Sequence, residues 1–482
     1  MRSTRRLVVY AAGLMAACTS NLMAGDPERG DLPPLQVPKE VIRFELLPRT
    51  SIFADSAFPQ DAFGNTISML EADLNTLTSF GTRHTLSETE SETRGIGAAR
   101  RWVADRFREA GEGVVVTLES NLVRGGERRI PRDVEVVNVV CEIPGKMEAA
   151  KGRRYYMLAH LDSRNSDGMD AEGDAPGAND AASGVAAMIE IAHTLARMDL
   201  DSTVVLVATS GEEQGLYGAK KHVERAIENG WDVRGVLNND TVGDPYGPWP
   251  ADSERGREAR GLIRVFSQGI PVEASAEAYR RLSQLGAESD SVSRQLARYV
   301  DFVARWHDTP VKPMLVFRND RFLRGGDHTP FVEAGFAGVR FTVPYEDYDR
   351  QHQDVRVENG TKYGDTAEWI NGGYLRDVTL LNALTLIHLA NAPSVPGNAR
   401  IITAELDNDT VIRWDASPEP DVAGYEVVAR RTTSPQWERS FDVRGNLSFT
   451  TDLHKDNWFF GVRAYDKDGY RSPVAFCGVA SE

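Results

Sequence analysis

The sequence predicts an α/β domain with a mostly parallel mixed sheet covered by helices on both faces, followed by a small all-β sandwich. The first observation is a series of short apolar runs that each end in polar residues and are separated by helical segments. The second is a change, after a linker, to apolar residues that alternate with period two. The runs of the first kind cover residues 136–141, 155–161, 204–209 and 233–237.

The chain begins with the features of an export signal, which we assign to residues 1–24. Three arginines precede an apolar run over residues 7–17, and this run is too short to span a bilayer. Cleavage after Ala24 and cleavage before Cys18 both fit the pattern, and the second would leave a cysteine that carries a lipid. We therefore expect a secreted or periplasmic protein without a transmembrane helix, either free or lipid-anchored at Cys18.

The α/β domain is expected at residues 61–392, after an extended lead-in at residues 25–60 that is rich in proline and charge. Its first helix is indicated by apolar residues spaced by three and four, namely Ile67, Leu70, Leu74 and Leu77. Further amphipathic helices are predicted over 97–110 and over 181–198, and the second of these suits a crossover between parallel strands. The polar segment 244–311, with helical pieces, is interpreted as an elaboration of the core.

A linker, Asn-Ala-Pro-Ser-Val-Pro-Gly at 391–397, separates this domain from a smaller one at residues 393–482. The smaller domain resembles a fibronectin type III domain through Trp-Asp at 414–415, Gly-Tyr-Glu-Val at 424–427 and Val-Arg-Ala-Tyr-Asp at 462–466. Trp458 stands where that family usually has its corner tyrosine. The partner of this domain is not readable from the sequence.

Composition narrows the classes of function. The 482 residues carry 71 acidic and 55 basic side chains, a net charge of -16, whereas nucleic-acid-binding proteins usually carry a basic surface. We therefore expect no nucleic-acid partner. Three cysteines are too few for a disulfide scaffold.

The apolar run 155–161 ends in His160-Leu161-Asp162. A histidine and an aspartate two residues apart at a strand end face the same side, so Asp162 is placed to hold one ring nitrogen of His160 while the other binds a metal ion. Such a triplet also occurs by chance, and alone it is a weak signal.

Three further acidic positions follow at comparable places. Asp180 starts the predicted crossover helix, where it is also typical of an ordinary N-cap. Glu212 and Glu213 follow the run 204–209, and two adjacent carboxylates there are costly to bury unless a positive charge neutralises them; a solvated loop is the alternative. Asp240 ends the run that begins at Val233.

Together these residues predict a metal site. His160, Glu213 and Asp240 stand at the carboxyl ends of three apolar strands, and in open α/β sheets ligands bind in the crevice beyond those ends. Imidazole and carboxylate groups without cysteine suit a catalytic Zn²⁺, with Mn²⁺ or Co²⁺ as alternatives.

Six short motifs make the chain resemble the co-catalytic zinc aminopeptidases of the secreted bacterial leucyl aminopeptidase type, with glutamate carboxypeptidases and glutaminyl cyclases as relatives. They are Ala-His-Leu-Asp-Ser at 159–163, Pro-Gly-Ala-Asn-Asp at 176–180, Ser-Gly-Glu-Glu-Gln-Gly at 210–215, Asn-Asp at 239–240, Gly-Asp-His-Thr-Pro-Phe at 326–331 and His-Gln-Asp at 352–354. The resemblance implies that His160 and Asp240 hold one metal ion and that Glu213 and His352 hold a second. It also implies that Asp180 bridges the two ions.

The same resemblance implies that Glu212 is the general base and that Asp162 is the partner of His160. Charge arithmetic agrees with a pair of metal ions, because three ligand carboxylates would repel one another in an empty crevice. Two Zn²⁺ ions would overcompensate them and favour a bound hydroxide shared between the ions.

The late histidine is open to two interpretations. His328 and His352 both follow loop-like sequence, and motif position favours His352. Many relatives have an aromatic residue directly before this histidine, whereas here it is Gln351, so Tyr345 and Tyr348 are the nearby candidates for stabilising an oxyanion. The other six histidines lack such neighbours and are interpreted as surface or core residues.

Arg318, Arg321 and Arg324 form a basic cluster near the fifth motif. Such a cluster either binds a substrate carboxylate or forms a solvated face with surface ion pairs.

The sequence thus predicts a secreted dinuclear zinc aminopeptidase that hydrolyses N-terminal residues from peptides through a metal-bound hydroxide. The alternatives are a carboxypeptidase or a glutaminyl cyclase of the same fold, or a binding protein that has lost catalysis.

Overall fold

The computed structural model describes residues 62–479, apart from 127–128, 272–273 and 405–407. The predicted export signal, Cys18 and the predicted lead-in at 25–60 lie outside the described residues. Within the described part, no helix combines the length and the apolar character needed to cross a membrane.

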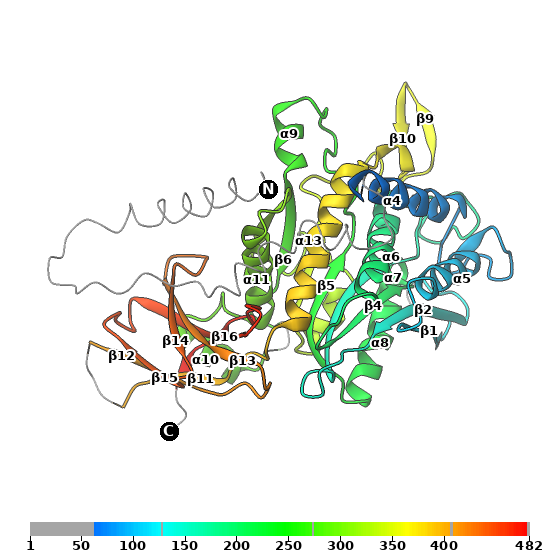
Figure 1. Cartoon of the computed structure of the whole chain (residues 1–482). Coiled ribbons are helices and arrows are strands. Elements are labelled where there is room, and N and C mark those ends of the chain that lie inside the picture. Colours follow the sequence, from blue (N-terminus) through cyan, green and yellow to red (C-terminus); the bar gives the residue numbers. More distant parts are fainter. Residues whose placement is uncertain (1–61, 127–128, 272–273, 405–407, 480–482) are drawn as a thin grey trace, which may run out of the picture. The chain divides into compact units, whose positions relative to one another are not determined.

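An eight-stranded mixed sheet forms the centre of the α/β domain (Figure 1). Its strand order is β1-β2-β4-β3-β5-β8-β6-β7, and the central run from β4 through β3 and β5 to β8 is parallel. The strands are β1 Val115–Val123, β2 Val134–Ile143, β3 Arg153–His160, β4 Thr203–Thr209, β5 Asp232–Asn239, β6 Leu262–Ser267, β7 Lys312–Val316 and β8 Gly338–Thr342.

Helices cover both faces of this sheet, as the sequence predicts. Apolar residues of five helices share one core with the sheet: α4 Ala62–Ser79, α5 Gly95–Arg108, α6 Ser183–Leu195, α11 Val292–Trp306 and α13 Gly372–Asn391. Two helices pack on the other face: α8 Tyr217–Glu228 and α12 His328–Glu333. The remaining elements of the domain are α7 Glu212–Gly215, α9 Glu254–Arg260, α10 Ala276–Leu285, the short helices η1 Ala178–Ala182 and η2 Ala367–Trp369, and the hairpin of β9 Arg356–Glu358 and β10 Thr361–Tyr363.

The central strands read as nearly continuous apolar runs because they are buried on both faces. In β3, Tyr155, Met157 and Ala159 belong to the core under α6 and α13, whereas Tyr156 and Leu158 belong to the core under α8 and α12. Two separate cores therefore hold β3 from opposite sides.

The four predicted strands correspond to β2, β3, β4 and β5, and the predicted helices 97–110 and 181–198 to α5 and α6. The interpretation of segment 244–311 as an elaboration is wrong in one respect, because β6 within it joins the main sheet between β8 and β7. The first four residues of β6 alternate between half-buried and buried positions, so the sequence contains no unbroken apolar run that would predict this strand.

The C-terminal strands form two sheets, with orders β15-β12-β11-β18 and β14-β13-β16-β17, that enclose one core. All strand pairs in them are antiparallel except β11 with β18. This arrangement is a small β-sandwich, as predicted; its assignment to the fibronectin type III family stays a prediction. The strands are β11 Gly397–Ile402, β12 Thr410–Asp415, β13 Val422–Arg431, β14 Arg439–Arg444, β15 Ser448–Thr451, β16 Trp458–Asp466, β17 Ala475–Phe476 and β18 Gly478–Val479.

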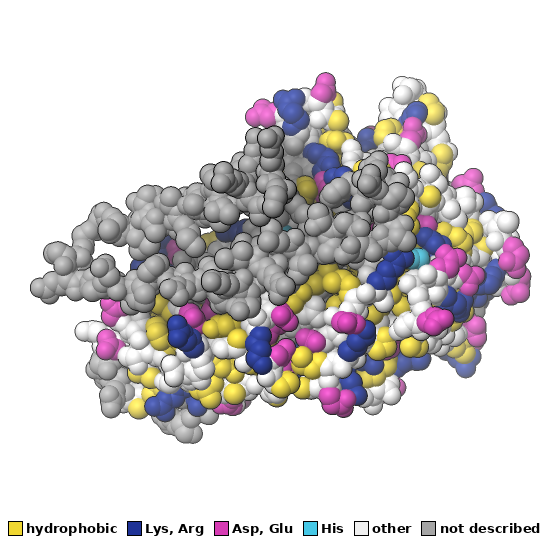
Figure 2. All heavy atoms as spheres, viewed as in Figure 1, with side chains coloured by type: hydrophobic (Ala, Val, Ile, Leu, Met, Phe, Trp, Pro, Cys, Tyr) yellow, Lys and Arg dark blue, Asp and Glu magenta, His cyan; other side chains and the backbone are white. Residues whose placement is uncertain are grey.

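On the face shown in Figure 2, acidic and basic side chains are intermingled among apolar ones.

Candidate metal centre

The predicted ligands come from loops at one edge of the sheet. His160 is the last residue of β3, Asp240 directly follows β5, and Glu213 lies in α7 after β4. Because β4, β3 and β5 are mutually parallel, their carboxyl ends meet at this edge. Asp180 joins them from η1, which leads into α6, and His352 from the loop after β8.

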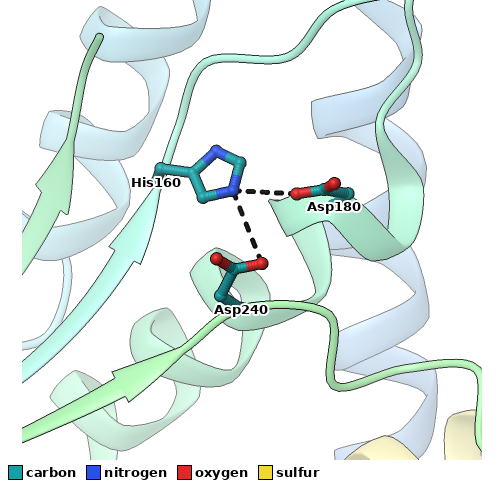
Figure 3. A group of neighbouring side chains, drawn as sticks. All are labelled: His160, Asp180 and Asp240. Atoms are coloured by element: carbon teal, nitrogen blue, oxygen red, sulfur yellow. Dashed lines mark hydrogen bonds and ion pairs between the residues drawn. The ribbon is translucent and has the colours of Figure 1, made fainter. Parts of the chain in front are cut away.

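The first group consists of His160, Asp180 and Asp240, which point toward one another in Figure 3. The His160 Nε2 atom lies 2.9 Å from Asp180 Oδ1 and 3.7 Å from Asp240 Oδ1. All three side chains are buried.

The second group consists of Asp180, Glu213 and His352. The His352 Nε2 atom lies 2.9 Å from Asp180 Oδ2 and 2.9 Å from Glu213 Oε1. Asp180 thus offers one carboxylate oxygen to each group. This is the geometry that the bridging role expected for Asp180 requires.

The donor atoms fit metal ions. His160 donates from Nδ1 to the backbone carbonyl of Asp162, 2.9 Å away, so in the neutral ring Nε2 carries the lone pair. That lone pair faces carboxylate oxygens, which are also acceptors. Although burial by itself lowers the pKa of His160, Asp180 and Asp240 raise this pKa well above its usual range. The surroundings of Nε2 therefore favour a positive charge, and a zinc ion supplies one.

Two carboxylate oxygens point to the same conclusion. Glu213 Oε1 and Asp240 Oδ1 are both buried, and neither receives a hydrogen bond of good geometry among the described residues. The nearest positively charged or neutral donors are His352 Nε2, 2.9 Å from Glu213 Oε1, and Arg340 Nη2, 2.9 Å from Asp240 Oδ1. One of the two oxygens belongs to each group. Because an unsatisfied buried carboxylate is costly, each group fits a bound cation better than an apolar or neutral neighbour.

Both groups open into one cavity of about 350 Å³. The cavity is lined by the carboxylates of the site and by positively charged or small residues: Arg129, Arg164, Asp180, Glu212, Glu213, Gln214, Gly215, Asp240, Arg321, Leu323, Arg324, Gly325 and His352. A substrate in this cavity would lie directly against both groups.

Residues 138–372 match the model of peptidase family M28. A probable zinc metalloprotease of Pyrenophora tritici-repentis is 43% identical over 414 residues, which cover 84% of each chain. A probable zinc metalloprotease of Leptosphaeria maculans is 44% identical over 412 residues, covering 85% of this chain and 94% of that one. The chain belongs to peptidase family M28.

Among solved structures, the LapA aminopeptidase of Legionella pneumophila is 15% identical to this chain. The TM-score is 0.47, and the match covers 76% of this chain and 78% of that one.

As a member of family M28, the chain is a zinc-dependent hydrolase. Of the two candidates for the late ligand, His352 lies in the second group and His328 lies in neither. His328 is buried at the start of α12, and its Nε2 atom is 3.0 Å from the backbone oxygen of Asn319. The other six histidines also lie outside both groups.

His352 differs from His160 in its second ring nitrogen. The Nδ1 atom of His352 lies 2.7 Å from Arg164 Nη2, a donor, and Arg164 Nε also donates to Glu213 Oε2 at 2.9 Å. Glu213 and Asp180 raise the pKa of His352 to about 10 against the opposing effect of burial. His352 has a φ of 58°, in the left-handed region, a conformation that side chains other than glycine adopt at a cost.

The prediction that the Asp162 carboxylate holds the ring of His160 is wrong, because the backbone carbonyl of Asp162 does so. The carboxylate of Asp162 lies 4.0 Å from His160 Nδ1, and the backbone carbonyl makes the hydrogen bond instead. The Asp162 carboxylate accepts hydrogen bonds from the backbone N–H groups of Glu212 and Glu213, at 3.3 and 3.0 Å. The chain turns directly after β3. The backbone carbonyl of Asp162 therefore contacts the His160 ring, and its carboxylate binds the turn that carries Glu212.

Glu212 lies beside the ligands without being one. Its side chain lines the cavity, and among the described residues no hydrogen-bond or ion-pair partner of its carboxylate is found. Burial raises the pKa of Glu212 well above its usual range, and the nearby carboxylates of Glu213, Asp240 and Asp327 raise it further. The preceding residue, Gly211, has a φ of 75°, which glycine adopts without strain and which starts the tight turn after β4.

Two buried residues that the sequence analysis missed hold the loop of Asp180. Arg83 donates to the backbone oxygens of Leu161 at 2.7 Å and Gly177 at 3.0 Å, linking the loops after β3 and before η1. The Asp365 carboxylate accepts from the backbone N–H groups of Asn179 and Asp180. Neither residue lies in one of the six motifs, so only the folded chain reveals them.

Close packing also fixes this loop. A Cβ atom at Gly184 would lie 2.3 Å from the backbone oxygen of Asn239 and 2.8 Å from the Cβ of Ala159. Glycine therefore lets α6 approach β3 and β5 closely enough for Asp180 to reach the neighbouring ligands.

The expected oxyanion candidates, Tyr345 and Tyr348, are not among the residues that line the cavity. Gln351, which replaces the aromatic residue of many relatives, donates from Nε2 to Asp180 Oδ2 at 2.7 Å. It therefore positions the carboxylate that the two groups share.

Proposed function

We propose that this member of family M28 is an aminopeptidase that holds two zinc ions and removes N-terminal residues from peptides. The observation that carries the proposal is the pair of ligand groups joined by Asp180, with Glu212 beside them and facing the same cavity. The resemblance of the six motifs to the leucyl aminopeptidases supports the peptide substrate, and the N-terminal specificity is part of the proposal.

His160, Asp180 and Asp240 would hold one zinc ion, and Asp180, Glu213 and His352 the other. Zinc in such sites acidifies water and polarises a carbonyl group. The three ligand carboxylates bring three negative charges, which two Zn²⁺ ions more than balance.

Glu212 is the residue that moves the proton. Its carboxylate takes the proton of the attacking water and then gives it to the nitrogen of the leaving amine, so that the peptide bond breaks without releasing an amide anion. Asp162 fixes the backbone of Glu212 and Glu213 through their N–H groups, which keeps base and ligand in register.

Peptides with blocked ends test this proposal. The zinc-loaded protein should cleave a peptide with a free N-terminus and an amidated C-terminus, and N-acetylation should abolish cleavage. A chelator should remove the activity, and zinc addition should restore it. Cleavage of the acetylated peptide that requires a free C-terminal carboxylate would identify a carboxypeptidase instead, and conversion of N-terminal glutamine to pyroglutamate without hydrolysis would identify a cyclase.

The number of zinc ions is tested separately by metal analysis of the purified protein. We expect about two zinc ions per chain, with His352→Ala retaining about one and His328→Ala about two. A single ion in the unsubstituted protein would contradict the dinuclear site.

We also propose that the chain is exported, which the pattern of residues 1–24 supports. Mass spectrometry of the mature N-terminus would identify cleavage after Ala24 or a lipid-modified Cys18. An intact N-terminus in cell extracts would contradict export.

A further inference from the structure

The active-site cavity of this acidic protein is lined by four arginines, Arg129, Arg164, Arg321 and Arg324. Arg129 and Arg164 lie near each other at one wall of the cavity. Both approach Gly168: a Cβ atom built on this glycine would lie 3.5 Å from Arg129 Nε and 3.7 Å from Arg164 Nη1. The other two arginines belong to the loop between β7 and α12.

Two of these arginines are already paired. Arg321 is buried and donates to Asp320 at 3.1 Å and to Glu346 at 2.6 Å. Arg164 donates to the Glu213 carboxylate, as described above. Their charges therefore serve mainly to hold the walls of the cavity.

Among the described residues, the one ion-pair partner of Arg324 is a distant one. Its Nη1 atom lies 3.7 Å from Glu346 Oε1, an oxygen that already accepts from Arg321, and Arg264 contacts the other oxygen of Glu346 at 3.1 Å. One carboxylate thus faces three guanidinium groups. The Arg324 side chain is 34% exposed, so it keeps donors that can turn toward the cavity.

Arg129 pairs with no carboxylate among the described residues. Its Nη1 atom donates to the backbone oxygen of Glu213 at 2.7 Å, which holds the guanidinium at the cavity wall and leaves its other nitrogens without a partner among the described residues. Its backbone has a φ of 60°, and Leu323, next to Arg324, has a φ of 58°. Both left-handed residues line the cavity, and such strain persists where the surrounding structure needs that side-chain placement.

The ligand carboxylates do not need these arginines once zinc is bound, because the metal ions neutralise Asp180, Glu213 and Asp240. The cavity then has an excess of positive charge in a partly desolvated space, where a guanidinium–carboxylate contact is stronger than in water.

We propose that Arg129 and Arg324 bind a carboxylate of the peptide substrate, so that the enzyme prefers peptides with glutamate or aspartate next to the cleaved bond. This specificity rests on the peptidase function proposed above. The C-terminal carboxylate of a short peptide has the same chemistry, and the experiment separates the two sources.

Two pairs of amidated tripeptides, each matched in shape, test the proposal: Glu-Ala-Ala against Gln-Ala-Ala, and Ala-Glu-Ala against Ala-Gln-Ala. In at least one pair we expect kcat/KM to be at least about tenfold higher for the glutamate peptide, as one charge-assisted contact allows. Raising the salt concentration should lower that ratio, because salt screens exposed charges.

Substitution then assigns the preference. Arg129→Gln and Arg324→Gln should each bring the glutamate-to-glutamine ratio down by about tenfold. Arg318→Gln is the matched control, because Arg318 lies in the same loop but stacks on exposed Phe322 and does not line the cavity; its ratio should equal that of the unsubstituted protein. Circular dichroism and zinc content would verify that each variant is folded and loaded.

Each other outcome is decisive. Cleavage of the amidated peptides with no preference for glutamate in either pair, or a preference that neither substitution reduces, overturns the arginine proposal and leaves the aminopeptidase function standing. Cleavage only of acetylated peptides with a free C-terminus overturns the aminopeptidase function. If Arg129→Gln or Arg324→Gln then loses that cleavage, these arginines bind the C-terminal carboxylate of the substrate. If the cleavage persists in both variants, the arginine proposal is overturned as well. A protein that cleaves no peptide contradicts both.

Discussion

Two regions of this chain bury groups of charged side chains, and they differ in how those charges are satisfied. Where the sandwich meets α11, Asp290 accepts from Arg298 at 3.1 Å and also pairs with Arg430, and the three side chains are at most 2% exposed. In the metal centre, Glu213 Oε1 and Asp240 Oδ1 are buried, and among the described residues neither receives a hydrogen bond of good geometry, although His352 and Arg340 lie 2.9 Å away.

The difference separates a structural role from a functional one. The carboxylate of Asp290 receives donors on both oxygens, the second from Arg430 on the sandwich strand β13, so its charge is fully paired within the folded chain. In the metal centre, His352 and Arg340 offset part of the buried negative charge, but neither makes a hydrogen bond of good geometry to the two oxygens. The metal centre therefore remains incompletely satisfied, and a bound cation would complete it. A substitution should therefore affect stability in the first region and chemistry in the second.

The largest expected effect is the loss of catalysis in Glu212→Gln. Because Glu212 is a ligand in neither group, the variant should keep its zinc while kcat falls by about 10²- to 10⁴-fold, the usual contribution of a general base. Steady-state kinetics on an amidated peptide, together with zinc analysis, would measure both. The matched variant Glu213→Gln should lose zinc as well as activity, and a parallel loss of zinc in Glu212→Gln would contradict the assignment of the base.

The opposite pattern is expected for Asp290→Asn. Removing this charge leaves Arg298 and Arg430 buried without their shared counter-ion, which should lower the free energy of unfolding by about 3 to 5 kcal/mol without changing the zinc content. Urea unfolding followed by tryptophan fluorescence measures this loss.

Asp105→Asn is the control for Asp290→Asn, since Asp105 pairs with Arg108 on the exposed face of α5. We expect it to change the free energy of unfolding by less than about 0.5 kcal/mol. A similarly small effect of Asp290→Asn would show that the buried cluster adds nothing to stability.

The same contrast explains what could be predicted from the sequence. The central strands and the ligand positions were predictable because each ligand follows an apolar run, and parallel strands bring their carboxyl ends together. Motif position favoured His352 over His328, but both follow loop-like sequence, and the fold was needed to show which one reaches the other ligands. It is the left-handed turn at His352 that brings its ring to Asp180 and Glu213.

Contacts between distant segments were beyond sequence reasoning. Arg83 and Asp365 hold the loop of Asp180 from positions 97 and 185 residues away, counted from their own numbers, and nothing in their local sequence marks them. The Asp290–Arg430 pair spans 140 residues. Which atom of Asp162 contacts His160 depends on the turn after β3, and the sequence motif does not specify this turn. The Asp162 carboxylate was therefore assigned to His160, although it accepts from the backbone N–H of Glu213.

The smallest expected effect is the pH dependence contributed by Glu426, a buried carboxylate of the sandwich strand β13. Glu426 accepts from Arg463 at 2.6 Å and from Arg471 at 3.0 Å, and these arginines lie over the rings of Phe302 and Trp306 of α11. Burial by itself raises its pKa, but the two guanidinium groups hold the pKa at about 2, below the ordinary value of 4.5.

A pKa that is lower in the folded than in the unfolded chain stabilises the fold at pH values above the unfolded value. For Glu426 this contribution is about 3 kcal/mol; it is complete above about pH 4.5 and is lost as the pH falls through about 2. The difference in unfolding free energy between the unsubstituted protein and Glu426→Gln should therefore be largest near neutral pH and shrink in acid. Urea unfolding at a series of pH values would measure it.

Glu358→Gln, which removes an exposed ion pair with Arg356, is the control and should show a small difference in unfolding free energy that does not change in this way. A difference for Glu426→Gln that stays constant between pH 6 and pH 2 would mean that the arginines do not stabilise its charged form, and the contrast between a fully paired carboxylate and an incompletely satisfied metal centre would then rest on Asp290 alone.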